Sequence, residues 1–272
     1  MTDLLTDHPV HHLQTGPVMT AYRSIGSGEP LLMITAMGGT MSGWDRRLIS
    51  RLTLEYRVII YDIRGTGYSS GENAEVSIQA MATDASLLLK GLGISPCHIF
   101  GYSLGSMIGL QLAVSHPDLV CSLVLCCASR SGISVYNRIT SWFSPENPGI
   151  IPYHARFPPE FLNEHPDLSD VFPPPSHPVN IPAILRQLDA IGAWEFSDKA
   201  LAGIRKPVLL LTGEEDCITP VEDAETIASH LNDVISIRVP GGGHGMMYQV
   251  PDRIAALMLD FLSQKENRYL AR

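Results

Sequence analysis

A serine stands between two glycines in "GYSLG", residues 101–105. An apolar stretch precedes Gly101 and a helical pattern starts directly after Ser103, so the serine falls where a strand turns into a helix. An ordinary turn, a phosphate-binding loop and a catalytic nucleophile on a strained corner all need consideration. Such a corner crowds the backbone and demands small residues two positions before and after the serine, which Gly101 and Gly105 supply. No G-x-x-x-x-G-K-[ST] or G-x-G spacing occurs here, so the pattern favours a nucleophile over a phosphate loop.

A serine hydroxyl is a weak nucleophile and needs an adjacent base. Among ten histidines, His244 lies in "PGGGHGMMYQ", between a predicted strand and the last predicted helix. The surrounding glycines give this loop room to reach over the edge of a sheet. By contrast, His8, His11 and His12 belong to an N-terminus that we expect to be frayed. His244 is therefore the candidate base.

The base in turn needs a carboxylate that fixes its tautomer and stabilises the imidazolium. Glu214, Glu215 and Asp216 come just after the apolar strand pattern "KPVLLLTG". The segment after another strand pattern, "SLVLCC", holds "ASRSG" and no carboxylate. The candidate acid is therefore one of the three residues 214–216, and spacing alone does not choose among them.

Short apolar runs alternate with helical patterns on both sides of these candidates. Strands are predicted at 31–35, 58–62, 98–101, 122–127, 206–213 and 234–239, and helices at 43–53, 78–91, 104–115, 181–191, 221–231 and 251–262. Continuous apolar strands suit a parallel sheet that is covered on both faces. The sequence therefore predicts an α/β fold with a doubly wound, mostly parallel sheet and helices on both faces.

The alternation of strand and helix patterns stops in the segment 131–198, which holds 11 of the 20 prolines and several aromatic residues. Proline excludes central strands here. We expect a core domain formed by 1–130 and 199–272, with 131–198 as a small, loop-rich helical cap over the site. The alternative is that this segment is a purely structural insertion with its own small core. Arg130, directly before this segment, is either a contact for a substrate carboxylate or a solvated surface residue.

Composition excludes several classes of function. The chain has 272 residues, is 45% hydrophobic and carries a formal net charge of -9 with no long basic cluster, which excludes nucleic acid and anionic membrane surfaces as expected partners. No run of about 18 apolar residues predicts a membrane span, and the N-terminus lacks a signal-peptide pattern.

Five cysteines without C-x-x-C spacing indicate free thiols in a reducing cytoplasm rather than disulfides or a metal site. No pattern predicts the oligomeric state.

Taken together, these segments resemble the α/β-hydrolase superfamily, in particular its serine esterase and lactonase branch with a short cap. "YDIRGTGYSS" is similar to the family's D-x-R-G-x-G-x-S turn, and "GGGHGMMYQVP" to its G-H segment before the final helix. The order of serine, acid and histidine is also that of the family. "KPVLLLTGEEDCITP" resembles the family segment that carries the acid, and this resemblance selects Asp216.

The resemblance also implies an oxyanion hole of two backbone N–H groups. One would come from Leu104, which follows the nucleophile, and the other from Met37 in the loop after the first predicted strand. Thr35 and Ala36 stand where the family commonly has His-Gly, which is a departure from its pattern.

The expected function is that of a serine hydrolase that cleaves a carboxylic ester of an apolar small molecule through an acyl-enzyme, without metal or organic cofactor. The small-molecule substrate would be an ester or a lactone. Lactone opening, carbon–carbon bond hydrolysis and perhydrolysis use the same triad and remain alternatives, as does a small-molecule receptor on the same scaffold. Epoxide hydrolases and dehalogenases are disfavoured because those relatives have aspartate in the place of Ser103.

Overall fold

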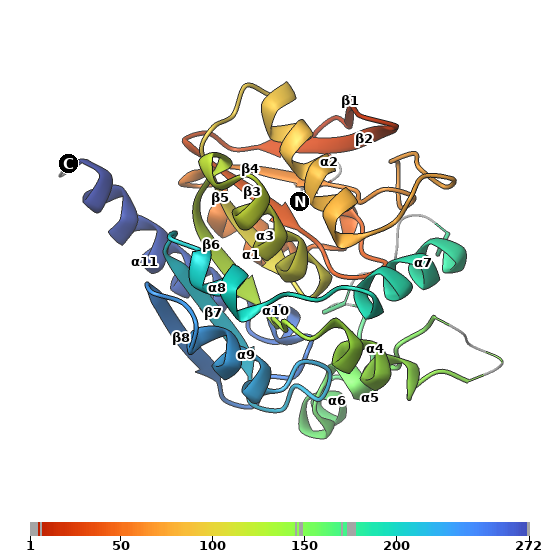
Figure 1. Ribbon diagram of the computed structural model, residues 1–272. Coiled ribbons are helices and arrows are strands. Elements are labelled where there is room, and N and C mark those ends of the chain that lie inside the picture. Colours follow the sequence, from red (N-terminus) through yellow and green to blue (C-terminus); the bar gives the residue numbers. More distant parts are fainter. Residues whose placement is uncertain are drawn as a thin grey trace.

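The computed structural model in Figure 1 describes residues 5, 7–144, 146, 149–169, 171–172 and 178–270, and the side chains of these residues up to 264. One twisted sheet runs through the molecule, with helices packed against both of its faces. Four further helices lie together at one end of the sheet.

The sheet has eight strands in the order β1-β2-β4-β3-β5-β6-β7-β8. β1 pairs antiparallel with β2, and β2 with β4, while every other neighbouring pair is parallel. The strands are β1 His11–Thr15, β2 Val18–Ile25, β3 Glu29–Ile34, β4 Tyr56–Tyr61, β5 Cys97–Tyr102, β6 Val120–Cys126, β7 Val208–Gly213 and β8 Val234–Val239. The predicted fold class, doubly wound and mostly parallel, is confirmed.

The helices divide between two buried apolar clusters, one on each face of the sheet. On one face lie α2 Ile78–Gly91, α3 Leu104–Ser115, α8 Asp198–Gly203 and α9 Val221–Ala228, and on the other α1 Arg46–Leu52, α10 Met246–Gln249 and α11 Pro251–Leu270. Short 3-10 helices, η1 Met41–Gly43 and η2 Pro117–Leu119, complete the connections. Alternating apolar residues of β3, β5 and β6 enter both clusters, as expected for central strands covered twice.

The N-terminal region differs from the expectation of a frayed terminus. Residues 11–25 form the β1–β2 hairpin, whose turn contains Gly16 at φ +64°. The hairpin is bound to the domain because β2 pairs with β4 from Tyr22 to Ile25. His11 and His12 therefore lie in a strand at the edge of the sheet rather than in a tail.

Between β6 and β7 the chain forms several short helices, as expected for a loop-rich helical segment. Besides the predicted helix, α7 Ile181–Gly192, this stretch holds α4 Gly132–Thr140, α5 Tyr153–Arg156 and α6 Pro159–Glu164. An isolated bridge between Ser131 and Glu195 closes the base of the stretch, and α4 packs on α7. Its division from the core as a cap of 131–198 stays a prediction.

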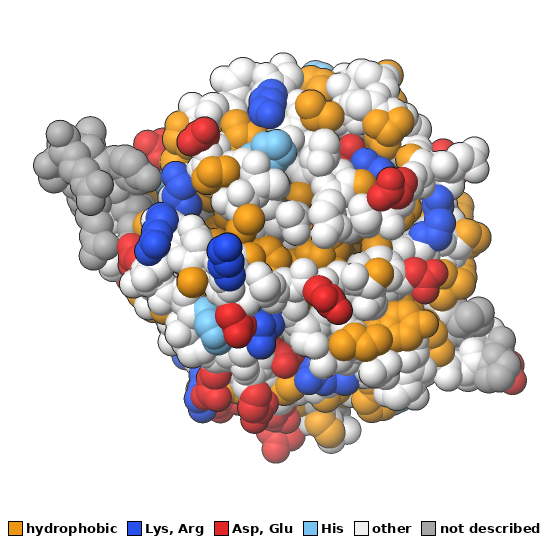
Figure 2. Space-filling view, viewed as in Figure 1, with side chains coloured by type: hydrophobic (Ala, Val, Ile, Leu, Met, Phe, Trp, Pro, Cys, Tyr) orange, Lys and Arg blue, Asp and Glu red, His pale blue; other side chains and the backbone are white. Residues whose placement is uncertain are grey.

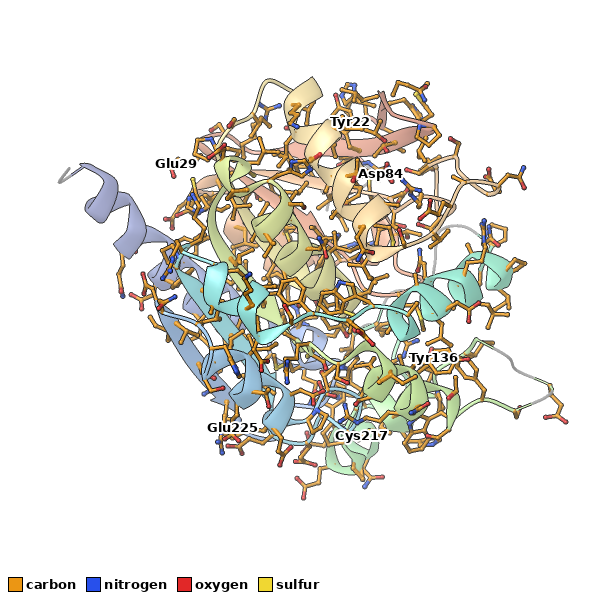
Figure 3. All side chains as sticks on the ribbon, viewed as in Figure 1. Tyr22, Glu29, Asp84, Tyr136, Cys217 and Glu225 are labelled. Atoms are coloured by element: carbon orange, nitrogen blue, oxygen red, sulfur yellow. The ribbon has the colours of Figure 1, made fainter. Side chains whose placement is uncertain are left out.

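Acidic side chains gather on one side of the molecular surface, over α9 and its neighbouring loops (Figure 2). Glu225 on α9 lies in this region, and so does the nearby Cys217 (Figure 3). Cys217 is exposed and Cys121 half-buried, whereas the other three cysteines are buried, so the expectation of buried free thiols holds for three of five. No helix within the described residues has the length and apolar character needed to cross a membrane.

Close backbone packing brings α3 onto the sheet next to the serine turn. A Cβ on Gly105 would lie 2.0 Å from the carbonyl oxygen of Ile34 at the end of β3, and one on Gly101 would lie 2.3 Å from the oxygen of Gly105. One turn further along α3, a Cβ on Gly109 would make ordinary contacts at 3.4 Å or more, all to side chains. The two elbow glycines are thus required sterically, and Gly109 is not.

This contrast predicts different costs for two alanines in the same helix. Gly105→Ala should destabilise the protein by about 3 kcal/mol, because a backbone carbonyl cannot move aside as a side chain can. Gly109→Ala should change stability by less than about 1 kcal/mol, since helix propensity favours alanine. Urea unfolding of both variants checks this, and equal stabilities would contradict the packing argument.

Candidate active site

Ser103 occupies a strained corner between β5 and α3. Its backbone has φ +55° and ψ −112°, a conformation that a non-glycine residue adopts only when its surroundings impose it. The Ser103 N–H donates to the Cys126 carbonyl at 2.9 Å, and the Ser106 hydroxyl donates to the carbonyls of Gly101 and Cys126. These bonds tie the corner to β6, and the strain presents the serine side chain beyond the carboxyl end of the strand.

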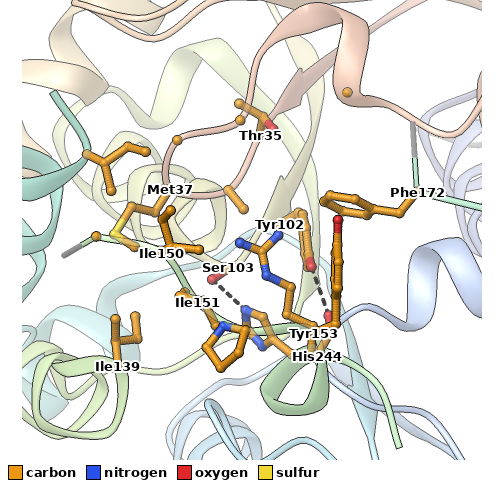
Figure 4. A pocket seen from close by; sticks show the side chains of 18 of the residues that line it. Thr35, Met37, Tyr102, Ser103, Ile139, Ile150, Ile151, Tyr153, Phe172 and His244 are labelled. Carbon is orange, nitrogen blue, oxygen red and sulfur yellow. Dashed lines mark hydrogen bonds between the residues drawn. The ribbon is translucent and has the colours of Figure 1, made fainter. Parts of the chain in front are cut away.

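His244 faces this serine from the loop that follows β8. Its Nε2 lies 3.0 Å from Ser103 Oγ, as the dashed line in Figure 4 shows. The Tyr102 hydroxyl donates to the His244 carbonyl oxygen at 2.9 Å, which fixes the backbone of the histidine from the neighbouring position of the serine turn. Tyr102 was not among the predicted site residues, because nothing in the sequence links residue 102 with residue 244.

Asp216, in the loop after β7, meets the other ring nitrogen of His244. Its Oδ2 and Oδ1 lie 2.9 and 3.1 Å from His244 Nδ1. Asp216 also accepts hydrogen bonds from the N–H groups of Ile218 and Thr219 and from the Thr219 hydroxyl. The Asp216 side chain is fully buried, and Thr219 completes its hydrogen bonding. Thr219 was not predicted as a site residue from the sequence.

The charges of this buried pair support each other. Burial by itself would raise the pKa of Asp216, but the neighbouring His244 and the hydrogen bonds from Thr219 outweigh it and hold that pKa below its usual range. Burial likewise would lower the pKa of His244, and the Asp216 carboxylate outweighs this effect and raises it. Asp216 is consequently an anion that stabilises the protonated form of His244.

The other two candidate acids of the loop after β7 do not reach His244. Glu214 and Glu215 are both exposed, and their backbone N–H groups donate to the carbonyls of Val239 and Gly242. Only Asp216, of the three acids, contacts His244.

The two expected oxyanion donors both lie near Ser103, and their role stays a prediction. Leu104 is the first residue of α3, directly after Ser103, and Met37 lines the same cavity as Ser103. Neither N–H group donates to an acceptor among the described residues. Both are therefore available to a bound molecule.

The loop that carries Met37 is held from two sides. The N–H of Gly38 donates at 2.8 Å to Oε1 of Gln187, a buried residue of α7. Further along, the N–H of Met41 donates at 2.7 Å to Asp62, whose second oxygen accepts from Tyr68 in the turn after β4. The D-x-R-G-x-G-x-S turn thus holds the loop from the core, and Gln187 holds it from α7.

A cavity of about 670 Å³ opens above Ser103 and His244 (Figure 4). Its walls come from the loop at 35–43 and from the stretch between β6 and β7, including Ile139, Ile150, Ile151, Tyr153 and Phe172. This size and apolar lining are typical of sites for small organic ligands.

One group of potential metal ligands occurs within the described residues. Cys127 Sγ, an Asp216 oxygen and a His244 ring nitrogen lie within 4.8 Å of one another. The carboxylate and the ring already bind each other, and the Cys127 thiol faces the His244 carbonyl at 3.4 Å. Burial and the neighbouring Cys126 raise the pKa of the Cys127 thiol well above its usual value, which disfavours the thiolate that a metal would need. The geometry therefore describes a serine-histidine-aspartate site with a buried thiol beside it.

Several known proteins are similar to this chain over most of its length. The protein called "Putative carbamate hydrolase RutD" in Pantoea ananatis is 30% identical over 252 residues, which cover 87% of this chain and 89% of that protein. Its namesake in Serratia proteamaculans is 29% identical over 261 residues, covering 88% and 92%. The solved structure of an alpha/beta hydrolase fold protein from Chitinophaga pinensis superimposes with a TM-score of 0.80 at 25% identity, over 96% of this chain and 99% of that one.

A family model gives the assignment directly. Residues 31–257, which include the serine turn and both loops that carry the acid and the histidine, match the model of the alpha/beta hydrolase family. With the sheet order, the strained serine and the order of the three site residues along the chain, this match shows that the protein belongs to the alpha/beta hydrolase family and is a hydrolase.

Proposed function

We propose that the protein hydrolyses a carboxylic ester of an apolar small molecule through an acyl-enzyme on Ser103. The observation that carries the proposal is the continuous chain of hydrogen bonds from Asp216 through His244 to Ser103 Oγ. Ser103, at the end of this chain, lines an apolar cavity. Such a chain delivers an activated nucleophile to a water-poor pocket.

In the first half of the reaction, His244 Nε2 accepts the Ser103 proton as the oxygen attacks the ester carbonyl. Asp216 keeps the Nδ1 proton of His244 directed away from the serine and stabilises the imidazolium that forms. The imidazolium then gives its proton to the leaving alcohol, and Ser103 keeps the acyl group.

The oxyanion of each tetrahedral intermediate is assigned to the N–H groups of Met37 and Leu104. The Leu104 donor also carries the partial positive charge of the α3 N-terminus. In the second half, His244 activates a water molecule, which attacks the acyl group and releases the acid. His244 then passes the proton that it took from the water to Ser103 Oγ as the acyl bond breaks, which restores the serine hydroxyl. The net reaction is ester plus water to acid plus alcohol, with no change of oxidation state.

Carbamate cleavage is a second candidate, favoured by the names of the two RutD relatives. The same residues would attack a carbamoyl carbonyl and form a carbamoyl-enzyme. The cavity of about 670 Å³ is far larger than carbamate itself requires, which favours a larger ester. A receptor that retains the triad would instead bind a ligand tightly and turn it over slowly.

Replacement of the nucleophile gives the direct test. Ser103→Ala should lower kcat/KM for p-nitrophenyl esters by roughly four to six orders of magnitude, because His244 then has no hydroxyl to activate. The panel should contain acyl chains of increasing length, several lactones and phenyl carbamate, and intact-mass spectrometry should look for an adduct on Ser103.

Ser115→Ala, at the far end of the same helix, is the control and should retain full activity. Within the described part of the chain, the Ser115 hydroxyl bonds only to the Gln111 carbonyl of α3, and Ser115 does not line the cavity. Preference for phenyl carbamate over every ester would replace the ester proposal by the carbamate one. Equal slow rates in the native protein and Ser103→Ala would refute both.

The His244–Asp216 pair predicts a specific pH dependence. His244 must be neutral to accept a proton, and Asp216 raises its pKa, so kcat/KM should rise with pH through an ionisation above the ordinary histidine value of about 6.5. Asp216→Asn removes that charge and should move this acid limb to lower pH, while kcat falls roughly 10⁴-fold. Glu215→Gln, with an exposed side chain, should leave the profile in place. An acid limb that does not move in Asp216→Asn would show that another group titrates.

Gln187 is assigned as a positioning residue for the Met37 donor. Gln187→Met keeps the volume but removes the acceptor of the Gly38 N–H, so kcat should fall roughly tenfold with little change in KM. Gln111→Met loses a comparable bond, to Trp194, outside the cavity and serves as the control. A lowered melting temperature with unchanged kcat would reduce Gln187 to a purely structural role.

A further inference from the structure

Arg156, at the end of α5, is fixed against the loop of the candidate base. Its carbonyl oxygen accepts a hydrogen bond of 2.7 Å from the N–H of Gly245, the residue next to His244. The following residue, Phe157, is buried and packs so closely that a Cβ on Gly245 would lie 2.3 Å from its ring. The backbone of Arg156 is therefore held at a set distance from the catalytic loop.

The side chain of Arg156 lines the cavity together with Ser103 and His244. Its guanidinium carbon lies 5.3 Å from the centre of the Phe172 ring, in the geometry of a cation over an aromatic face. The phenols of Tyr102 and Tyr248 are close enough to respond to the charge. Burial raises the pKa of each, and the Arg156 charge acts in the opposite direction.

This guanidinium is left incompletely paired. Nε of Arg156 is buried and has no hydrogen-bond partner among the described residues, and no carboxylate among them forms an ion pair with this arginine. Six other arginines each have an acidic partner: Arg47–Asp45, Arg51–Asp252, Arg64–Asp84, Arg130–Asp198, Arg138–Asp223 and Arg238–Glu225. Two more, Arg23 and Arg57, donate from Nε to the His8 carbonyl and the Ser24 hydroxyl, so their Nε atoms are satisfied without an acid. A buried donor without an acceptor costs free energy, and a protein usually satisfies it with a ligand or water.

The charge balance of the cavity points the same way. The described residues that line it include Arg156 and two histidines but no aspartate or glutamate, although the chain as a whole carries a formal net charge of -9. Acidic side chains gather instead over α9 (Figure 2). A single fixed positive charge in an otherwise apolar chamber favours a ligand with a single negative charge.

We propose that Arg156 binds a carboxylate of the substrate, so that the natural substrate is an apolar ester that carries one free carboxylate. The inference rests on the proposed function and adds one charged group to the apolar ester expected there. The planar guanidinium offers parallel N–H donors that match the two oxygens of a carboxylate. A phosphate dianion is a poorer match, because the cavity provides only one permanent cation among its described residues.

Arg130, which the sequence analysis considered for this role, does not take it. Its guanidinium pairs with Asp198 and contacts the Phe196 carbonyl, and it is not among the residues that line the cavity. It therefore offers a matched control, since it carries the same charge outside the cavity.

Two pairs of esters test the proposal, each pair differing only in a free or methylated carboxylate. Mono-p-nitrophenyl adipate against its methyl ester places the charge on the acyl side, and para-acetoxybenzoate against its methyl ester places it on the leaving group. In at least one of the two pairs, the native enzyme should have a kcat/KM at least tenfold higher for the ester with the free carboxylate than for its methylated partner. Arg156→Gln should reduce this preference roughly 10- to 100-fold, mainly through KM, and Arg156→Lys should keep part of it. Arg130→Gln should keep all of it.

The outcomes separate this inference from the proposed function. Turnover of the methylated esters tests ester hydrolysis by itself, whatever the anion preference. Absence of a preference in both pairs, or an equal loss on both members of a pair in Arg156→Gln, would overturn the role of Arg156.

If no ester is cleaved, the proposed function fails and binding decides about Arg156. Calorimetry should then show that monomethyl adipate binds Ser103→Ala and binds at least tenfold more weakly when Arg156→Gln is added. Equal binding to the two variants, or no binding to either, would refute the carboxylate site.

Discussion

The strained turn at Ser103 is the constraint on which the site depends. A positive φ at a non-glycine residue costs of the order of 1 to 3 kcal/mol, and the surrounding contacts must repay it. They do so through the hydrogen bond from Ser103 N–H to β6 and through the contact of Gly105 with the end of β3. The turn therefore holds β3, β5, β6 and α3 in fixed positions relative to one another, and these elements in turn hold the serine in place.

The two partner residues reach this serine from loops at the same end of the sheet. β7 and β8 are parallel to β6, so the loops after them emerge where the serine turn does. Asp216 and His244 are each held by bonds outside the triad, from Thr219 to the carboxylate and from Tyr102 to the histidine backbone. Preorganisation of this kind leaves little rearrangement for the reaction itself.

The stretch between β6 and β7 completes the site instead of only covering it. Gln187 accepts the N–H of Gly38 beside the Met37 donor, and the carbonyl of Arg156 accepts the N–H of Gly245 beside His244. Movement of this stretch would therefore act on both the oxyanion loop and the base. It also supplies much of the apolar wall of the cavity and, among the residues that the structure describes, its single arginine.

The sequence by itself determined the fold class and most central elements, and it gave Ser103 and His244 as the candidate nucleophile and base. Helices at 78–91 and 104–115 and the strand at 234–239 end where predicted, because local periodicity, caps and glycines define them. Family resemblance selected Asp216 from three adjacent acids, and the structure brings that residue alone of the three to His244. Tertiary structure decided the remainder. The β1–β2 hairpin depends on its pairing with β4, and the short helices around Phe157 depend on packing against the core. The positions of Tyr102, Thr219, Gln187 and Arg156 follow from contacts mostly between residues far apart in the chain, which no local pattern records.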